Sequence, residues 1–465
     1  MKEYDALFVS VPSAAPGMYF AYSQQGMPPL GLAYIATFIR EFGYVSKIID
    51  LSHPFVTLST LIDFLEGNTV RIVGLSCSTE AYNTAVRLSS IIKRIYPDVV
   101  IVLGGYHVSF EYETTLKNND VDYVVIGEGE LVFKQICDAI IRKEGKIFDV
   151  KGIAYKNSGK IIKTQVMPFI NDLDSLPIPD RSFFDNLHEY PIPATISTSR
   201  GCPGKCIFCS ASALSGGRYR LRSADNIVSE FEYLYSFGFN HICVIDDTMT
   251  ADLKRLDGIL DKLIKKRIGV TWYCESRVDS LSKSVLVKMK DAGVVAIQFG
   301  VESGSQSILD CIKKNIKIEQ ILRVFEWCHE LGISTMTNFI VGLPSDTHDT
   351  IQKSNDLANV LIEKGASVTF SICTPFPGTP IWIDPNKYEI KIENNDLDFY
   401  TTSCPVFSTK NLSLQDIRNE YYNSIKQLGP NFGVRIYGNP KYNPHFVKFF
   451  PAFKCLETET SNEVK

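Results

Sequence analysis

Three of the twelve cysteines of this chain lie close together, in the segment GCPGKCIFCSA from Gly201 to Ala211. Cys202, Cys206 and Cys209 are spaced C-x3-C-x2-C, and thiolates are soft ligands that suit iron or zinc. Structural zinc sites need four ligands, usually as two pairs, and no second pair lies nearby. Three close cysteines instead favour an iron–sulfur cluster that keeps one iron open, and a chance grouping of buried thiols is the alternative.

The overall composition excludes several classes of protein. A formal net charge of −4 and a pI near 6.0 leave no basic surface for nucleic acid. The amino-terminal segment MKEYDALFVSVPSAAPG has early acidic residues and a short apolar run broken by proline, which fits neither a secretory signal nor a transmembrane helix. We therefore expect a soluble cytoplasmic protein whose remaining cysteines, scattered from Cys77 to Cys455, are buried thiols rather than disulfides.

The elements that must position these residues form two alternating blocks of an α/β protein. Residues 1–145 contain five short β-branched runs separated by amphipathic stretches, which predicts a doubly wound, Rossmann-like (flavodoxin-like) domain with a parallel sheet. Ligands of such sheets bind at the carboxyl ends of the strands, where this chain has Ser76–Ser78, Gly104–His107 and Gly127–Glu130. No G-x-G-x-x-G follows the first strand, so a dinucleotide is disfavoured, and tight βα turns are the alternative reason for the glycines.

The second block, residues 191–385, contains six strand-like runs separated by helical patterns. It predicts a partial (β/α)6 TIM barrel, whose chemistry collects at the carboxyl ends of the strands. Residues 146–190 are expected to form a connector with a small hairpin, and residues 386–465 a mainly helical carboxy-terminal region. The aromatic segment His445–Leu456 is expected to be a packed terminal helix or loop, with an active-site cover or a membrane contact as alternatives.

With the cysteine motif at the end of the first barrel strand, the chain resembles the radical S-adenosylmethionine enzymes, in their branch with an amino-terminal cobalamin-binding domain. The resemblance covers roughly residues 1–382. It implies a [4Fe-4S] cluster held by Cys202, Cys206 and Cys209, whose open iron chelates S-adenosylmethionine. One electron then cleaves that cofactor to methionine and a 5′-deoxyadenosyl radical, and an external donor such as flavodoxin or ferredoxin supplies the electron.

Three further stretches match the family, namely VIDDTMT, GVESG and NFIVGLP. The resemblance assigns their residues to S-adenosylmethionine, from its methionine part through the ribose to the adenine: Asp246, Asp247 and Thr248, then Glu302, then Ile340 and Gly342 with Phe208. A carboxylate after the second strand suits the ammonium group of the cofactor. Arg277 is a candidate partner for a carboxylate of cofactor or substrate. The alternative for each polar residue is a structural hydrogen bond at a strand end.

The first domain resembles the family's cobalamin-binding domain in several recurring segments. The candidate cobalamin-binding residues are Ser76, Ser78, Gly104, Gly105, His107, Gly127 and Glu128. The D-x-H-x-x-G motif that supplies an axial histidine in many cobalamin proteins is absent, and His53 in DLSHP has the wrong spacing. His107 is expected to be a hydrogen-bonding loop residue rather than a cobalt ligand. Loss of the cobalamin remains an alternative.

The leading functional hypothesis is a cobalamin-dependent radical methyltransferase acting on an unactivated carbon, or on phosphorus, of a small metabolite or lipid precursor. A ring-forming or rearranging enzyme with the same cofactors is the second reading, and a non-enzymatic cobalamin- or redox-responsive binding protein is a reading from another class. Methylthiolation would need a second cluster, for which the first domain is one thiol short. Cys373, at the sixth barrel strand, is the candidate hydrogen donor or base.

Overall fold

The computed structural model describes residues 1–13, 26–53 and 55–428. The chain forms two compact units. The first comprises Met1–Pro193 with Asp396–Phe399, and the second comprises Ala194–Asn395 with the described residues from Tyr400 onward.

The first unit is built on one seven-stranded sheet in the order β2-β1-β3-β4-β5-β6-β7. Its first five strands are parallel: β1 (Glu3–Ser10), β2 (Ser46–Asp50), β3 (Thr69–Ser76), β4 (Val100–Gly104) and β5 (Tyr123–Val125). The strand order reverses between β1 and β3, which is the switch point at which flavodoxin-like sheets bind ligands. The predicted doubly wound sheet is confirmed.

The predicted hairpin also forms, and it belongs to this sheet. Strands β6 (Ile153–Asn157) and β7 (Lys160–Lys163) pair antiparallel, and β6 pairs antiparallel with β5. The residues expected to form a connector therefore extend the sheet at one edge. A hairpin can lengthen a sheet in this way because antiparallel strands need no crossover helix.

The helices of the first unit cover the sheet, which accounts for its continuous apolar strands. They are α1 (Leu30–Glu41), α2 (Leu58–Gly67), α3 (Tyr82–Ile95), α4 (Tyr106–Phe110), α5 (Tyr112–Thr115) and α6 (Glu130–Cys137). Leu7, Val73 and Ile101, on three adjacent strands, are fully buried in the same core cluster as Ala85 and Ile92 of α3. This rigid core fixes the strand ends from which the candidate ligand-binding loops project.

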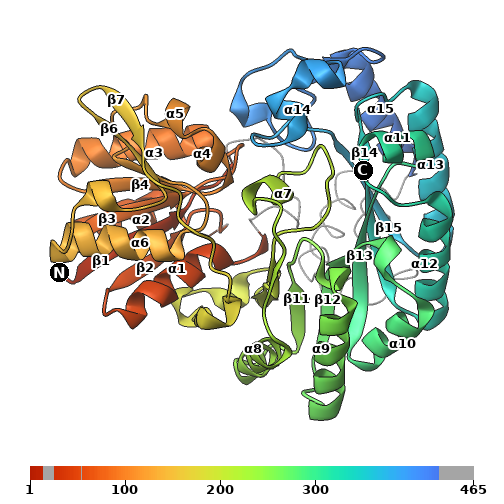
Figure 1. Ribbon diagram of the computed structural model, residues 1–465, viewed down its shortest axis with the longest axis horizontal. Coiled ribbons are helices and arrows are strands. Elements are labelled where there is room, and N and C mark those ends of the chain that lie inside the picture. The colour runs from red at the N-terminus through yellow and green to blue at the C-terminus, as the bar shows by residue number, and fades with distance from the viewer. Residues whose placement is uncertain (14–25, 54, 429–465) are drawn as a thin grey trace, which may run out of the picture. The chain divides into compact units, whose positions relative to one another are not determined.

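The second unit contains a six-stranded parallel sheet in the order β15-β14-β13-β12-β11-β8. The strands are β8 (Thr195–Ile196), β11 (His241–Val244), β12 (Thr271–Ser276), β13 (Val294–Glu302), β14 (Ser334–Val341) and β15 (Ser367–Ile372). Within the described residues β8 and β15 are not paired with each other, so the sheet is a partial barrel, as predicted. Figure 1 shows its helices along one face, and Trp272 of β12 packs edge-on against Phe231 of α8 on that face, with ring centroids 6.0 Å apart.

The outer layer of the second unit consists of helices that alternate with the strands. They are α8 (Ala224–Ser236), α9 (Leu253–Lys266), α10 (Lys283–Asp291), α11 (Gln306–Cys311), α12 (Ile318–Leu331) and α13 (His348–Glu363). Side chains that alternate with Trp272 along β12, namely Tyr273 and Glu275, point away from this layer and toward the opposite face of the sheet. The inner face of the sheet therefore carries polar side chains as well as apolar ones.

The region after residue 385, predicted to be mainly helical, is only partly so where the structure describes it. It has one 14-residue helix, α15 (Leu414–Gln427), and a two-stranded antiparallel ladder of β16 (Ile390–Ile392) and β17 (Phe407–Thr409). Asp396 and Asp398 accept hydrogen bonds from Asn83 of α3, which attaches this stretch to the first unit. Residues 429–465, with the aromatic segment His445–Leu456, lie outside the described residues. No helix in the described ranges is long and apolar enough to span a bilayer.

Candidate functional site

The three clustered cysteines lie on the loop that follows β8, as predicted, and none is in a disulfide. A Cβ atom on Gly204 would lie 3.3 Å from the Cys202 sulfur and 4.0 Å from the Cys206 sulfur, so both thiols face the space that this glycine leaves open. The Cys202 and Cys206 thiols also act electrostatically on Cys209, whose pKa is raised to about 12, mainly by burial. In the described part of the chain the thiols do not converge on one ion position. A cubane does not require that, because each cysteine binds a different iron.

The cysteine loop is anchored at both sides through the backbone of Ile207. Its N–H donates to the carbonyl of Ile312 (3.2 Å), and its carbonyl accepts from the N–H of Ile381 (3.4 Å). The Ile207 side chain is 1% exposed. Cys206 and Cys209 are therefore held on either side of a buried residue that touches the segments after β13 and β15, while Phe208 between them is half-buried.

Asp246 holds the strand that leads into the cysteine loop. Its Oδ1 accepts from the backbone N–H groups of Thr198 (2.5 Å) and Ser199 (3.1 Å), and its Oδ2 accepts from the hydroxyls of the same two residues, at 2.6 Å for Ser199. The carboxylate is 2% exposed, and the guanidinium of Arg255 lies 3.8 Å away. The geometry thus supports the structural alternative for Asp246, because both of its oxygens are occupied by the protein.

Asp247, the next residue, is solvent-exposed, and no side-chain hydrogen bond is recorded for it among the described residues. Desolvation by the surrounding protein, and then the charge of Asp246, raise the pKa of Asp247 to about 6. Its charge acts on both Cys202 and Cys209, so it lies beside the cysteine loop. Thr248 is fully buried, and its carbonyl accepts a hydrogen bond from the Tyr219 hydroxyl (2.9 Å).

Glu302, at the end of β13, is paired with a lysine that the sequence analysis did not single out. Lys314 Nζ lies 2.6 Å from Glu302 Oε1, and both side chains are 9% exposed. Lys314 follows Lys313 in the run KKNIK, which looks like a solvated basic turn, so no local signal marked it. Only its packing against a residue twelve positions away reveals it.

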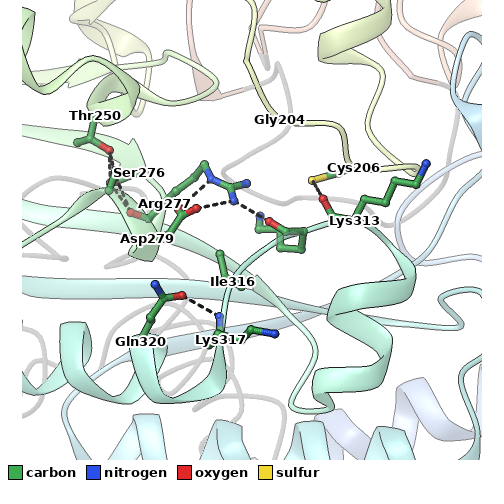
Figure 2. Close-up of polar contacts among 12 residues, drawn as sticks. Gly204, Cys206, Thr250, Ser276, Arg277, Asp279, Lys313, Ile316, Lys317 and Gln320 are labelled. Atoms are coloured by element: carbon green, nitrogen blue, oxygen red, sulfur yellow. Dashed lines mark hydrogen bonds and ion pairs between the residues drawn. The ribbon is translucent and has the colours of Figure 1, made fainter.

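Arg277 lies beside the same cysteines. Figure 2 shows its guanidinium bonded to both oxygens of Asp279 (3.0 and 2.9 Å), and it also donates to the carbonyl of Lys314 (2.6 Å). The charges of Cys206 and Cys202 act on Arg277, so the arginine is close to both thiols. Its hydrogen bonds therefore hold the Arg277 guanidinium in place beside the cysteine loop.

Glu275 is a second functional candidate that sequence reasoning missed. It lies on the inner face of β12, opposite Gln298 of β13, and no side-chain partner is recorded for it among the described residues. Burial, followed by the charges of Asp247, Asp246 and Glu302, raises the pKa of Glu275 to about 8. The carboxyl is therefore neutral at pH 7 and can donate a hydrogen bond into the barrel interior.

The remaining predicted residues of this unit lie on the last two strands. Ile340 is on β14, and Gly342 follows it with φ of 81°, where a Cβ would lie 3.1 Å from the side chain of Ile417 in α15. Cys373, after β15, is 2% exposed, and burial raises the pKa of its thiol. A buried, protonated thiol does not suit a base, so the structure gives no support to that part of the prediction.

In the first unit, the predicted residues gather at the carboxyl ends of β3, β4 and β5. Gly105 has φ of 109°, and a Cβ there would lie 2.4 Å from the carbonyl oxygen of Cys77, so this close approach requires glycine. Ser76 and Gly104 are opposite each other in the parallel register. Ser78 follows β3, and Gly127 with Glu128 follows β5; the Gly127 N–H donates to the hydroxyl of Ser109 (3.1 Å).

His107 is buried at this edge and makes a hydrogen bond as expected, but it lies in α4 and not in a loop. Its Nδ1 lies 3.3 Å from the Thr79 hydroxyl, and its ring lies 4.3 Å from that of Tyr82. Burial lowers the pKa of His107 to about 4, so the ring is neutral. His53 lies beyond β2, and its Nδ1 accepts from the N–H of Phe55 (3.3 Å), which places its proton on Nε2.

Comparison with known proteins gives two family models that match this sequence. The radical SAM superfamily model matches residues 196–358, and the B12 binding domain model matches residues 18–137. An uncharacterized methyltransferase of Pyrococcus horikoshii is 34% identical over 400 residues, which are 84% of this chain and 85% of that protein. An anaerobic magnesium-protoporphyrin IX monomethyl ester cyclase of Rubrivivax gelatinosus is 30% identical over 396 residues, which are 82% of this chain and 69% of that protein.

The fold is similar to that of a solved structure of OxsB. That structure is described as a cobalamin-dependent S-adenosylmethionine radical enzyme with aqua-cobalamin and S-adenosylmethionine bound. The TM-score is 0.74 at 18% sequence identity, over 96% of this chain and 70% of that one. The similarity covers the fold of both units.

Replacing Asp246 by Asn is expected to lower the free energy of unfolding by about 2 kcal/mol or more, because an amide nitrogen would face donors that now bond to a buried carboxylate. The matched control is Asp247→Asn, one residue away and exposed, which is expected to cause no loss at pH 7, because the surroundings that raise the pKa of Asp247 already disfavour its charge. Urea unfolding of the two variants measures the difference. Equal losses would contradict the anchoring role of Asp246.

Replacing Gly105 by Ala is expected to lower the free energy of unfolding of the first unit by about 2 kcal/mol and to weaken hydroxocobalamin binding, because the new Cβ meets the Cys77 carbonyl. Gly145→Ala is the matched control, since Gly145 also has a positive φ (77°) but no atom within 4 Å of the added Cβ. Thermal unfolding and absorption titration with hydroxocobalamin are the measurements. A Gly105 variant as stable as the control would show that the close approach is dispensable.

Glu275 is expected to make the protein less stable as pH rises. Because its pKa is about 8 when folded and near the ordinary 4.5 when unfolded, the folded state holds the extra proton, and stability falls between pH 5 and 8. The loss from this group is at most about 4 kcal/mol, and Glu275→Gln should remove it. Urea unfolding at pH 5.5 and 8 with both proteins tests this, and parallel pH profiles would refute it.

Proposed function

Because the chain belongs to the radical S-adenosylmethionine family, in its branch with an amino-terminal B12-binding domain, we propose that it methylates an unactivated carbon, or a phosphorus centre, of a small metabolite or lipid precursor. The observation that carries the proposal is the joint presence of the cysteine loop at the end of β8 and a B12-binding unit in one chain. The relative from Pyrococcus horikoshii, described as a methyltransferase, supports methyl transfer.

The proposal assigns the cluster to Cys202, Cys206 and Cys209, of which the first two have their sulfurs at the space beside Gly204. When bound, the cluster and S-adenosylmethionine supply a carbon radical, and cobalamin supplies the methyl group. The chain has to hold these groups, orient the substrate and exclude water.

Within the second unit, we assign the ammonium group of S-adenosylmethionine to the exposed carboxylate of Asp247. Glu302, fixed by Lys314, is assigned to the ribose hydroxyls, and Ile340 with Gly342 and Phe208 to the adenine. Glu275 is neutral at pH 7, and we assign its carboxyl as a hydrogen-bond donor to cofactor or substrate. Asp246 and Thr248 are assigned a structural role, because Asp246 accepts a hydrogen bond from Ser199 and the Thr248 carbonyl accepts one from Tyr219.

In the first unit, we assign cobalamin to the carboxyl ends of β3, β4 and β5. The glycines at Gly104, Gly105 and Gly127 let a large ligand approach the backbone, and the serines Ser76 and Ser78 offer neutral hydroxyls. His107 is neutral but bonded to Thr79, so we assign it to positioning the loop rather than to cobalt. An external donor, flavodoxin or ferredoxin, supplies the electron, and we place the reaction in the cytoplasm.

A ring-forming reaction is the second candidate, because the relative from Rubrivivax gelatinosus is described as a cyclase and is 30% identical to this chain. The cofactors of the two candidates are the same, and the products of S-adenosylmethionine differ. Methyl transfer consumes one further S-adenosylmethionine to remethylate cobalt and so forms S-adenosylhomocysteine. Ring formation does not require that second product.

The test uses the full chain purified without oxygen, with its cluster rebuilt and hydroxocobalamin supplied. After addition of a low-potential reductant and S-adenosylmethionine, 5′-deoxyadenosine and S-adenosylhomocysteine are measured by mass spectrometry. We expect both products, with 5′-deoxyadenosine lost in Cys206→Ala and S-adenosylhomocysteine formed only with cobalamin. Deoxyadenosine alone would favour ring formation, and neither product from a verified cluster would reject both candidates.

A further inference from the structure

A buried ion pair lies beside the cysteine loop of the second unit. Lys314 Nζ is 2.6 Å from Glu302 Oε1, with both side chains 9% exposed. Removing two charges from water is costly, and a buried pair of this kind is often no more stabilising than an apolar pair of the same size. Stability alone therefore does not account for the pair.

The backbone around the pair is shaped to hold it. A Cβ on Gly300 would lie 2.4 Å from Glu302 Oε1 and 2.5 Å from Lys314 Nζ, so a larger residue there would have to displace the charged ends of the pair. Glu302 has φ of 66°, and Lys313 and Asn315, on either side of Lys314, have φ of 57° and 56°. Left-handed backbone at non-glycine residues is unfavourable, and such positions gather where function requires a fixed geometry.

The same loop touches the cysteines. Figure 2 shows the carbonyl of Lys313 facing Cys206, at 4.0 Å from its sulfur. The carbonyl of Lys314 accepts from the guanidinium of Arg277 at 2.6 Å. The ammonium of Lys314 and the carboxylate of Glu302 both lie close enough to Cys206 to act on it electrostatically, and the ammonium has the larger effect. The buried pair therefore places its charges beside Cys206.

We propose that Lys314 is a positioning residue that makes the cluster held through Cys206 easier to reduce, with Glu302 as the counter-charge that limits this effect. The inference rests on the proposed function, since it needs the cluster. In the step concerned, one electron passes from the external donor to the cluster, so the donor is oxidised by one electron and no bond is made or broken. Reduction adds one negative charge at this site, and a buried ammonium close by favours it because the surroundings screen poorly.

The experiment compares two adjacent lysines. Lys314→Met removes the buried charge, and Lys313→Met removes an exposed charge from the same loop. The reduction potential of the rebuilt cluster is measured by a redox titration followed by electron paramagnetic resonance, without S-adenosylmethionine. We expect Lys314→Met to shift the reduction equilibrium about tenfold toward the oxidised form, which is about 59 mV for one electron, and Lys313→Met to shift it less than threefold. Lys314→Arg should keep the wild-type potential.

Glu302→Gln supplies a test of opposite sign. It removes the counter-charge and leaves Lys314 charged, so it should raise the potential. A Lys314→Met protein with full iron content and an unchanged potential would overturn the proposal. If that variant fails to retain its cluster, Glu302→Gln decides, because an unchanged or lowered potential there would overturn the proposal as well.

These measurements need no substrate, cobalamin or turnover. A cluster that never cleaves S-adenosylmethionine would reject the proposed function and leave the potentials of the variants interpretable. Conversely, normal cleavage products with no effect of Lys314 on the potential would reject this inference alone.

Discussion

The second unit depends on one buried carboxylate. Asp246 accepts hydrogen bonds from the backbone and hydroxyl groups of Thr198 and Ser199, which directly precede the cysteine loop. A charged acceptor with several donors in a poorly screened interior fixes these two residues more firmly than neutral contacts would. Because Cys202 comes only three residues after Ser199, this anchor fixes the start of the cysteine loop, and Ile207 holds its middle.

The second constraint on this site is its charge. The charges of Asp247 and Glu302 both act on Glu275, and a metal–thiolate group would add further negative charge. Three features limit the repulsion between these negative charges. Glu302 is paired with Lys314, Glu275 keeps its proton, and Asp247 is exposed to solvent. Each carboxyl thus differs in its protonation state or its partner, so neighbouring acidic side chains can serve as hydrogen-bond donor or acceptor.

The cysteine site and the two α/β units could be predicted from the sequence, because the patterns that indicate them lie within short segments of the chain. The spacing of Cys202, Cys206 and Cys209 is contained in one loop, and the two α/β blocks follow from hydrophobic periodicity, which the sheets and the family models confirm. What sequence could not show depends on contacts between distant segments. In the sequence Lys314 resembles a surface lysine, and only the folded chain shows that it pairs with Glu302. Likewise, the hairpin resembles a linker in the sequence, and only the structure shows that it pairs with β5.

Asp246 and Asp247 show most clearly what the sequence alone does not distinguish. They are adjacent, identical in type and equally placed in a family motif, so sequence reasoning assigned both to the cofactor. The backbone turns between them, so that one carboxylate is 2% exposed and bonded to Thr198 and Ser199, while the other is open to solvent beside Cys202. A strand end therefore supplies two neighbouring side chains with opposite surroundings, and only one of them can be free to bind a ligand.

The two units present different chemistry at their strand ends. In the first unit the backbone itself lines the edge, because Gly105 passes against Cys77 and the buried His107 is neutral. In the second unit charged side chains dominate, with Arg277 and Lys314 facing thiols and carboxyls. Close backbone approach suits a large ligand with many neutral hydrogen-bonding groups, whereas fixed charges suit a small, charged ligand and an anionic metal group. Such a division matches a bulky cobalamin in one unit and S-adenosylmethionine with its cluster in the other, since each edge supplies the interactions that the other lacks.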